Sequence, residues 1–156
     1  MVSPGRKLKP IQGGFVVMRP NQTVYEEFRD IVRKGDYRDK GGWGGKTGKF
    51  WGSMTFQGLL PYYYKILYPG RAVELNRGIY NNMGSNHRTE KAVNDTLLPG
   101  ECFTQEKDCE DCRARPVEEI VSTHFTVCQK PWLCMRHAQD AINHRLCRSL
   151  HEQWYL

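Results

Sequence analysis

The sequence predicts an α/β fold, because apolar runs of strand length alternate with segments of helical periodicity. Residues 15–18 form a short apolar run after two glycines and stop at a proline, as a buried strand would. Apolar residues at helical spacing follow over residues 23–34. Near the other end, the β-branched run at residues 120–123 precedes a second helical pattern over residues 138–154. The chain therefore reads as strand, helix and, much later, strand and helix again.

The composition is that of one globular domain. The chain has 156 residues, 39% of them hydrophobic and 12% aromatic, which is enough to bury a core. Residues 13–156 form the predicted domain, and residues 1–12 are a disordered or truncated lead-in. The formal net charge of +6 comes from scattered lysines and arginines without a recognition-helix or aromatic RNA-binding pattern. We therefore expect no nucleic-acid partner, and the positive balance equally suits a nucleotide-sugar diphosphate.

The cysteines and two glycosylation sequons point to an oxidising compartment. Asn21-Gln22-Thr23 and Asn94-Asp95-Thr96 are sequons, and the six cysteines crowd into the last third of the chain: Cys102, Cys109, Cys112, Cys128, Cys134 and Cys147. No apolar run is long enough to span a membrane, and the first ten residues lack the pattern of a signal peptide. These observations agree if the chain is part of a longer protein whose beginning is missing and which enters an oxidising lumen of the secretory pathway.

The first predicted helix has clear boundaries. Thr23 and Glu26 have the spacing of a capping box, and Gly35 ends the pattern. Residues 35–52 are rich in glycine and lysine but lack the order of a phosphate-binding P-loop, because Lys40 stands where its first glycine is required. A mobile surface loop, such as a lid, is the better interpretation.

Further elements follow from local patterns. Helical spacing returns over residues 57–67, residues 72–75 and 79–82 read as short extended pieces, and residues 101–116 form a cysteine-rich loop. The C-terminal helical pattern carries a stripe of histidines on its other side, at positions that recur every seven residues: His137, His144 and His151. Neighbours in this stripe stand about 10 Å apart along a helix, so we interpret them as solvated or partner-facing rather than as metal ligands.

The segment from His124 to Trp132 combines groups that can bind one ligand. The His124 imidazole suits a metal ion and the Lys130 ammonium suits a phosphate, while Pro131 and Trp132 are expected to hold the loop by packing. The segment would leave the predicted strand at residues 120–123. The alternative is a strand end with one satisfied histidine and one solvated lysine.

Four segments resemble motifs of glycosyltransferase family 8, the group that includes glycogenin and galactinol synthase. Residues 12–20, Gln-Gly-Gly-Phe-Val-Val-Met-Arg-Pro, resemble the family's Asn-Ser-Gly strand that ends in proline. Residues 56–60 resemble its Asp-Gln-Gly helix start, and residues 75–81 resemble its Leu-Pro…Tyr-Asn segment. Residues 124–132, His-Phe-Thr-Val-Cys-Gln-Lys-Pro-Trp, resemble its His-Phe-x-Gly-x-x-Lys-Pro-Trp signature. The order and the approximate spacing agree over most of the chain.

This resemblance implies the C-terminal half of a GT-A fold, with a partial mixed sheet and flanking helices. It implies a hexosyltransferase that uses a UDP-sugar donor, a divalent metal such as Mn²⁺, and a carbohydrate, lipid or protein acceptor, with retention at the anomeric carbon. Carried onto matching positions, His124 would be a metal ligand and Lys130 would contact the diphosphate. Gln57 would be the catalytic residue near the donor sugar, and Gln12 and Gly14 would line the donor site.

The chain departs from the family pattern at several positions. Phe56 replaces the aspartate before the glutamine, Gln12 replaces an asparagine, and Val127 replaces the glycine of the last signature. No Asp-x-Asp occurs, and a single imidazole does not hold a hard divalent ion. The nucleotide-binding half of the fold would precede Gly13. We therefore expect this chain to be a catalytic-domain fragment that is inactive alone.

Two other functions compete with this interpretation. The spacing Cys109-x2-Cys112-x11-His124-x3-Cys128 would suit a tetrahedral zinc site, although disulfides or buried thiols would account for the same residues. A carbohydrate- or partner-binding domain without chemistry would account for Phe56 and the absent carboxylates.

Overall fold

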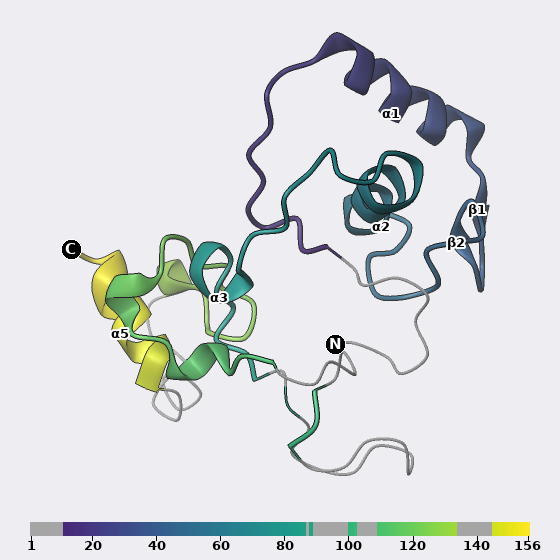
Figure 1. The fold of residues 1–156 in the computed structure, drawn as a ribbon. Coiled ribbons are helices and arrows are strands. Elements are labelled where there is room, and N and C mark those ends of the chain that lie inside the picture. The colour runs from purple at the N-terminus through teal and green to yellow at the C-terminus, as the bar shows by residue number, and fades with distance from the viewer. Residues whose placement is uncertain (1–10, 87, 89–99, 103–108, 134–144) are drawn as a thin grey trace. The chain divides into compact units, whose positions relative to one another are not determined.

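The computed structural model describes residues 11–86, 88, 100–102, 109–133 and 145–156 (Figure 1). The chain divides into two compact units, Met1–Glu74 and Leu75–Leu156, and each is described by itself. Among the described residues, no helix has the length and apolar character needed to cross a membrane.

Helix α1 (Gln22–Lys34) begins earlier than the capping-box pattern predicts. Its N-cap is Asn21, whose side chain accepts a hydrogen bond from the Val24 amide at 3.1 Å. The predicted box between Thr23 and Glu26 is therefore wrong, because Glu26 instead accepts from the Gln22 side chain at 2.7 Å. The predicted end is confirmed: Gly35 has a positive φ of 63°, and its amide donates to the carbonyl of Ile31.

Replacing Asn21 by alanine should lower the free energy of unfolding by about 1 kcal/mol, the usual cost of a lost N-cap. Thr23→Ala is the matched control and should change stability by less than about 0.5 kcal/mol, because Thr23 is exposed and does not cap the helix. Urea unfolding of both variants measures the difference. A larger loss in Thr23→Ala than in Asn21→Ala would restore the capping box.

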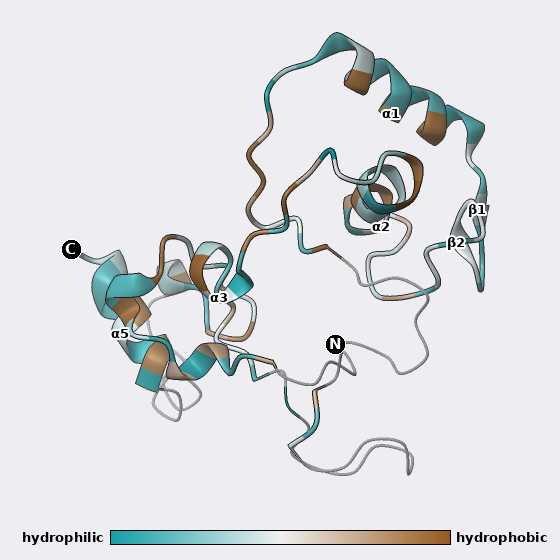
Figure 2. Cartoon of the chain, viewed as in Figure 1, coloured by the Kyte–Doolittle hydropathy of each residue, from teal (hydrophilic) through white to brown (hydrophobic). Residues whose placement is uncertain are grey.

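Helix α2 (Phe56–Pro61) confirms the helical pattern predicted over residues 57–67, but it continues as a π-helix over Tyr62–Leu67. Pro61 lacks an N–H, so the α-helical bond that residue 61 would donate to the Gln57 carbonyl cannot form. The buried face of α2 consists of Gly58, Leu59, Leu60 and Pro61. In Figure 2, α1 is mostly hydrophilic, whereas hydrophobic residues are prominent in α2.

Helix α1 packs on the π-helix through one aromatic and carboxylate cluster. The Phe28 ring stacks on the Tyr63 ring with centroids 4.3 Å apart. The Glu27 carboxylate accepts hydrogen bonds from the hydroxyls of Tyr63 and Tyr68. These two bonds lower the pKa of Glu27, while burial and the bond to Glu27 raise the pKa of Tyr63. The charged carboxylate and the neutral phenols thus join α1 to the π-helix and to Tyr68, which follows it.

The glycine-rich segment is largely packed rather than a free surface loop. Strands β1 (Tyr37–Arg38) and β2 (Gly42–Trp43) form a two-stranded antiparallel hairpin. Trp43, Thr47 and Phe50 are buried, and the Thr47 hydroxyl accepts from the Trp43 amide at 2.8 Å. The expectation of a surface loop is therefore wrong for these three residues. A Cβ on Gly42 would lie 2.0 Å from Thr47 Oγ1, so this close packing requires glycine.

The longer predicted strands are absent. Residues 15–18, 72–75 and 120–123 are not strands. The extended piece predicted at residues 79–82 is helical at its first two residues, which belong to helix α3 (Arg77–Tyr80). A strand needs a partner for its backbone groups, and the hairpin β1–β2 is the one sheet among the described residues. Val17 in the first of these segments is 81% exposed.

The core of the second unit lies under helix α5 (Arg145–Trp154). Short 3₁₀-helices at Cys112–Ala114, Val117–Glu119 and Pro131–Leu133 surround it. The core consists of Phe125, Cys128, Leu146, Cys147 and Leu150, with Val117 and Ile120 packed against it. The predicted C-terminal helix is confirmed from residue 145 onward, and residues 138–144 lie outside the described residues.

The prediction of a solvated or partner-facing histidine stripe is wrong at His151, the one of its three positions that the structure describes. His151 is 1% exposed, and its ring lies 5.6 Å from the Phe125 ring between centroids. It is part of the buried face of α5, not a solvated stripe. His137 and His144 lie outside the described residues.

Candidate functional site

The third and fourth motif segments lie side by side in the second unit. The amide of His124 donates to the carbonyl of Asn82 at 2.9 Å, and the amide of Asn82 donates to the carbonyl of Ser122 at 3.0 Å. Asn82 and Thr123 form an isolated parallel bridge. The predicted strand at residues 120–123 is thus reduced to this bridge, which nevertheless brings residue 81 close to His124.

The Asn82 side chain fixes this junction. It is fully buried, and its Nδ2 donates to the carbonyls of Gly78 at 2.9 Å and Cys112 at 3.1 Å. Its Oδ1 accepts from the Gly84 amide at 2.8 Å. This side-chain amide therefore joins α3, the Cys112 turn and Gly84, while the backbone carbonyl of the same residue accepts from His124.

Three side chains of the second unit have buried polar atoms with no hydrogen-bond partner among the described residues. These atoms are both amide atoms of Asn81, Nδ1 of His124 and both amide atoms of Gln129. A buried amide without partners costs about 1–3 kcal/mol per group, so such groups ordinarily meet water or a ligand. Sequence reasoning singled out His124 but not Asn81 or Gln129, because nothing in a pattern of letters shows that a polar side chain is buried.

Lys130 is folded back onto its own loop. Its Nζ donates to the carbonyl of Phe125 and lies 5.7 Å from the centroid of the Trp132 ring. Pro131 is buried, as expected of a residue that holds the loop by packing. Trp132 is 60% exposed and its ring lies 6.0 Å from the Trp154 ring between centroids, so it packs on one side only. The ammonium is therefore held beside the loop by a neutral acceptor, which a phosphate can replace with a stronger, charged one.

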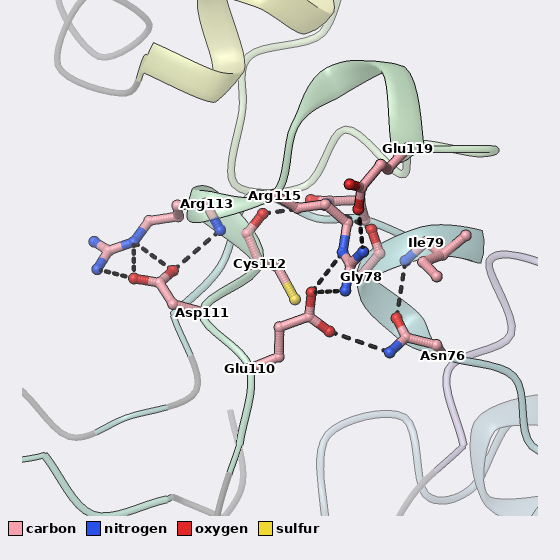
Figure 3. Close-up of polar contacts among 10 residues, drawn as sticks. Asn76, Gly78, Ile79, Glu110, Asp111, Cys112, Arg113, Arg115 and Glu119 are labelled. Carbon is pink, nitrogen blue, oxygen red and sulfur yellow. Dashed lines mark hydrogen bonds and ion pairs between the residues drawn. The ribbon is translucent and has the colours of Figure 1, made fainter.

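A network of charged side chains borders the Cys112 turn (Figure 3). Arg115 pairs with the carboxylates of Glu110 and Glu119, and the Asn76 side chain donates to Glu110 at 3.2 Å. The bond to Glu110 and its charge raise the pKa of Arg115. These carboxylates already have cationic partners, so the network serves to fix the turn.

The first and second motif segments meet in the first unit. Gln57 Nε2 donates to Gln12 Oε1 at 2.9 Å across a separation of 45 residues. The Gln57 side chain lies against Gly52, where a Cβ would come within 2.0 Å of Oε1. Gly14 is exposed, and Phe56 is partly exposed beside Gly13. Two of the predicted donor residues, Gln12 and Gln57, are therefore in direct contact.

The described residues do not by themselves form a metal site. They contain no group of three or more histidine, cysteine, aspartate or glutamate side chains placed to hold a metal ion. His124 is thus the one predicted metal ligand among the described residues, and the carboxylate ligands of a Mn²⁺ site would have to come from outside them. The metal ligands that the described residues offer are therefore too few to bind Mn²⁺ by themselves.

Disulfides occupy two of the four residues of the alternative zinc site. Cys102 pairs with Cys109 and Cys128 pairs with Cys147. Cys112 is a buried free thiol. The predicted set of three cysteines and one histidine does not form.

Cys112 should react with iodoacetamide about a hundredfold more slowly in the folded chain than in urea at the same pH, because only the thiolate is nucleophilic. Burial raises its pKa to about 11, which makes the thiolate scarce near pH 8. Mass spectrometry of the peptide that carries Cys112 measures the rate. Equal rates in the folded and denatured chain would contradict the buried thiol.

Comparison of the chain with protein-family models, with curated proteins and with solved structures gives no match.

Proposed function

We propose that this chain is the C-terminal part of the catalytic domain of a glycosyltransferase that uses a UDP-sugar donor and retains the anomeric configuration. The observation that carries the proposal is the pairing of the motif segments in space. The segments at residues 12–20 and 56–60 meet through Gln12 and Gln57, and those at residues 75–81 and 124–132 meet beside Asn82. Segments that resemble one family and lie far apart in sequence thus converge in two pairs.

Lys130 has the clearest role in this proposal. Its ammonium would contact the diphosphate and offset the negative charge that builds on the departing UDP, which stabilises the transition state. The contact with the Phe125 carbonyl keeps the side chain on its loop until a phosphate takes its place. Lys130 acts here as a point charge with three donors.

The amides provide polar contacts to the donor. Gln57 and Gln12 would hydrogen-bond the donor sugar, and the exposed Gly14 would allow the close approach of a ligand to the backbone. Within the second unit, the unpartnered amide of Asn81 and Nδ1 of His124 would be further polar contacts to the diphosphate that Lys130 meets. Neutral amides orient a sugar but do not ionise as a carboxylate does.

The metal and the remaining wall of the site would come from sequence that precedes this chain in the whole protein. A divalent ion would act as a Lewis acid on the leaving diphosphate. His124 would be one ligand of this ion. The ion's carboxylate ligands and the nucleotide-binding strands would lie upstream. A GT-A fold of this kind would give the exposed apolar residues 16–18 a neighbouring strand. We expect the isolated chain to be inactive for these reasons.

The compartment proposed for the whole protein is the Golgi lumen or another part of the secretory pathway. The two disulfides, Cys102–Cys109 and Cys128–Cys147, support an oxidising environment. The acceptor is a carbohydrate, lipid or protein.

Calorimetric titration with UDP and Mn²⁺ tests the proposed function. It should be done on this chain and on a chain extended upstream to include the nucleotide-binding half. Binding by the longer chain alone is the expected result. Binding by neither would overturn the transferase proposal, and full affinity in the short chain would overturn its assignment as a fragment.

A non-catalytic carbohydrate- or partner-binding domain is the second candidate, and Phe56 favours it. This side chain stands where the resembling family has a carboxylate, and it cannot act as an acid, a base or a metal ligand. Hydrolysis of UDP-glucose and UDP-galactose by the extended chain discriminates the two functions. Release of free sugar supports the transferase, whereas UDP binding without release from any UDP-sugar supports the binding domain.

A further inference from the structure

Helix α5 holds the loop that carries Lys130 at three successive points. A disulfide joins Cys147 to Cys128. His151 Nε2 lies 2.7 Å from the carbonyl oxygen of Gln129, and the Tyr155 hydroxyl, just beyond the helix end, donates to the carbonyl of Pro131. Because a carbonyl oxygen only accepts, Nε2 of His151 carries the proton of that bond.

These contacts lie on both sides of Lys130 in the chain. Gln129 precedes it and Pro131 follows it, and the backbone carbonyl of each is bonded to a side chain of the C-terminal segment. The Lys130 side chain takes no part in these contacts with the C-terminal segment, and its ammonium donates instead to the Phe125 carbonyl of its own loop, a neutral acceptor that a phosphate can replace.

The covalent link also reaches the neighbouring motif segment. A Cβ on Gly84 would lie 2.8 Å from Cys128 Sγ, so the disulfide packs directly on this glycine. Gly84 in turn donates its amide to the buried Asn82 side chain. The disulfide therefore ties the Lys130 loop, α5 and the Asn82 junction into one packed group.

We propose that the C-terminal helix positions Lys130 for the diphosphate of the donor, with Cys147, His151 and Tyr155 as positioning residues. The proposal rests on the proposed function and deepens it. The lysine reaches a phosphate from a backbone that is fixed before the ligand arrives, so binding does not have to order the loop. Reduction of Cys128–Cys147 would remove the covalent part of this support.

The test compares two double variants. In Cys128→Ser/Cys147→Ser the link between the loop and α5 is removed without leaving a free thiol. Cys102→Ser/Cys109→Ser is the matched control, because it removes a disulfide of the same unit that spans only seven residues and lies outside the Lys130 loop. Tyr155→Phe removes one hydroxyl from a side chain that is 59% exposed, so its fold should be unaffected.

Two measurements are made on each variant in the upstream-extended chain. Hydrogen exchange of a peptide that covers residues 124–133 should become about tenfold faster when Cys128 and Cys147 are replaced, because the loop then opens locally. Affinity for UDP should fall by about tenfold in the same variant and a few-fold in Tyr155→Phe, as expected for lost preorganisation. The control pair should show neither change.

The outcomes separate the two proposals. Unchanged exchange after loss of Cys128–Cys147, or faster exchange in both double variants, would overturn the positioning role of α5. Faster exchange with unchanged UDP affinity would also overturn it, because the lysine would not need its support. If the unaltered extended chain fails to bind UDP, the proposed function falls, and the exchange pattern still decides whether α5 holds the loop.

Discussion

Replacing Lys130 by alanine in the upstream-extended chain is expected to lower turnover well over tenfold, which corresponds to more than about 1.4 kcal/mol of transition-state stabilisation. The variant removes the ammonium that would meet the departing diphosphate and leaves the neighbouring residues of the loop unchanged. His124→Ala should have an effect of similar size if its imidazole is a metal ligand. Steady-state rates of sugar transfer or of donor hydrolysis provide the measurement.

Lys49→Ala is the matched control for the loss of one positive charge. Lys49 pairs with Asp39 on the surface, and both side chains are exposed. Surface pairs of this kind contribute about 1 kcal/mol or less to stability, so the control should keep its turnover. Unchanged turnover in Lys130→Ala, or an equal loss in Lys49→Ala, would refute the role of Lys130 at the diphosphate.

The helical patterns of α1, α2 and α5 could be predicted from the sequence because their signals are local, whereas the second half of the short helix α3 was expected to be extended. The end of α1 at Gly35 and the apolar face of α2 depend on residues within a few positions of one another. The strands could not be predicted in this way. An apolar run such as residues 15–18 has the composition of a strand, but its pairing depends on a partner that the run does not contain.

The misplaced face of α5 has a different cause. Counting only aliphatic and aromatic residues put His151 on the polar side, but Cys147 is buried in a disulfide one helical turn before it. A helix face that includes Cys147 and Leu150 also includes His151. The pairing of Cys128 with Cys147 was therefore the missing information, and spacing alone does not determine which cysteines pair.

The residues of the candidate site likewise divide into those with a local sequence signal and those that only tertiary packing reveals. His124, Lys130 and Gln57 stand out because imidazole, ammonium and amide groups occur within segments that resemble known motifs. Asn81 and Gln129 do not stand out, because their interest comes from burial without a hydrogen-bond partner. Burial of a polar side chain depends on the tertiary packing, so it becomes visible only in the structure.

Replacing Gly58 by alanine should destabilise the chain by about 1–3 kcal/mol, the range for overpacking of a well-packed interior. A Cβ at this position would lie 1.8 Å from the carbonyl oxygen of Ser53, which is backbone and cannot rotate away. The direction of the effect is informative, because glycine to alanine within a helix ordinarily stabilises by about 0.5–1 kcal/mol. Urea unfolding gives the change in free energy.

Gly13→Ala provides the control, since its Cβ would meet only the partly exposed Phe56 ring, at 3.0 Å, and a side chain can move aside. We expect a change of less than about 1 kcal/mol there. If Gly58→Ala proves neutral or stabilising, α2 does not start against Ser53 as described. If Gly58→Ala unfolds the first unit, the close packing of α2 on the Ser53 backbone requires a glycine after Gln57. The contact between Gln57 and Gln12 then depends on that packing.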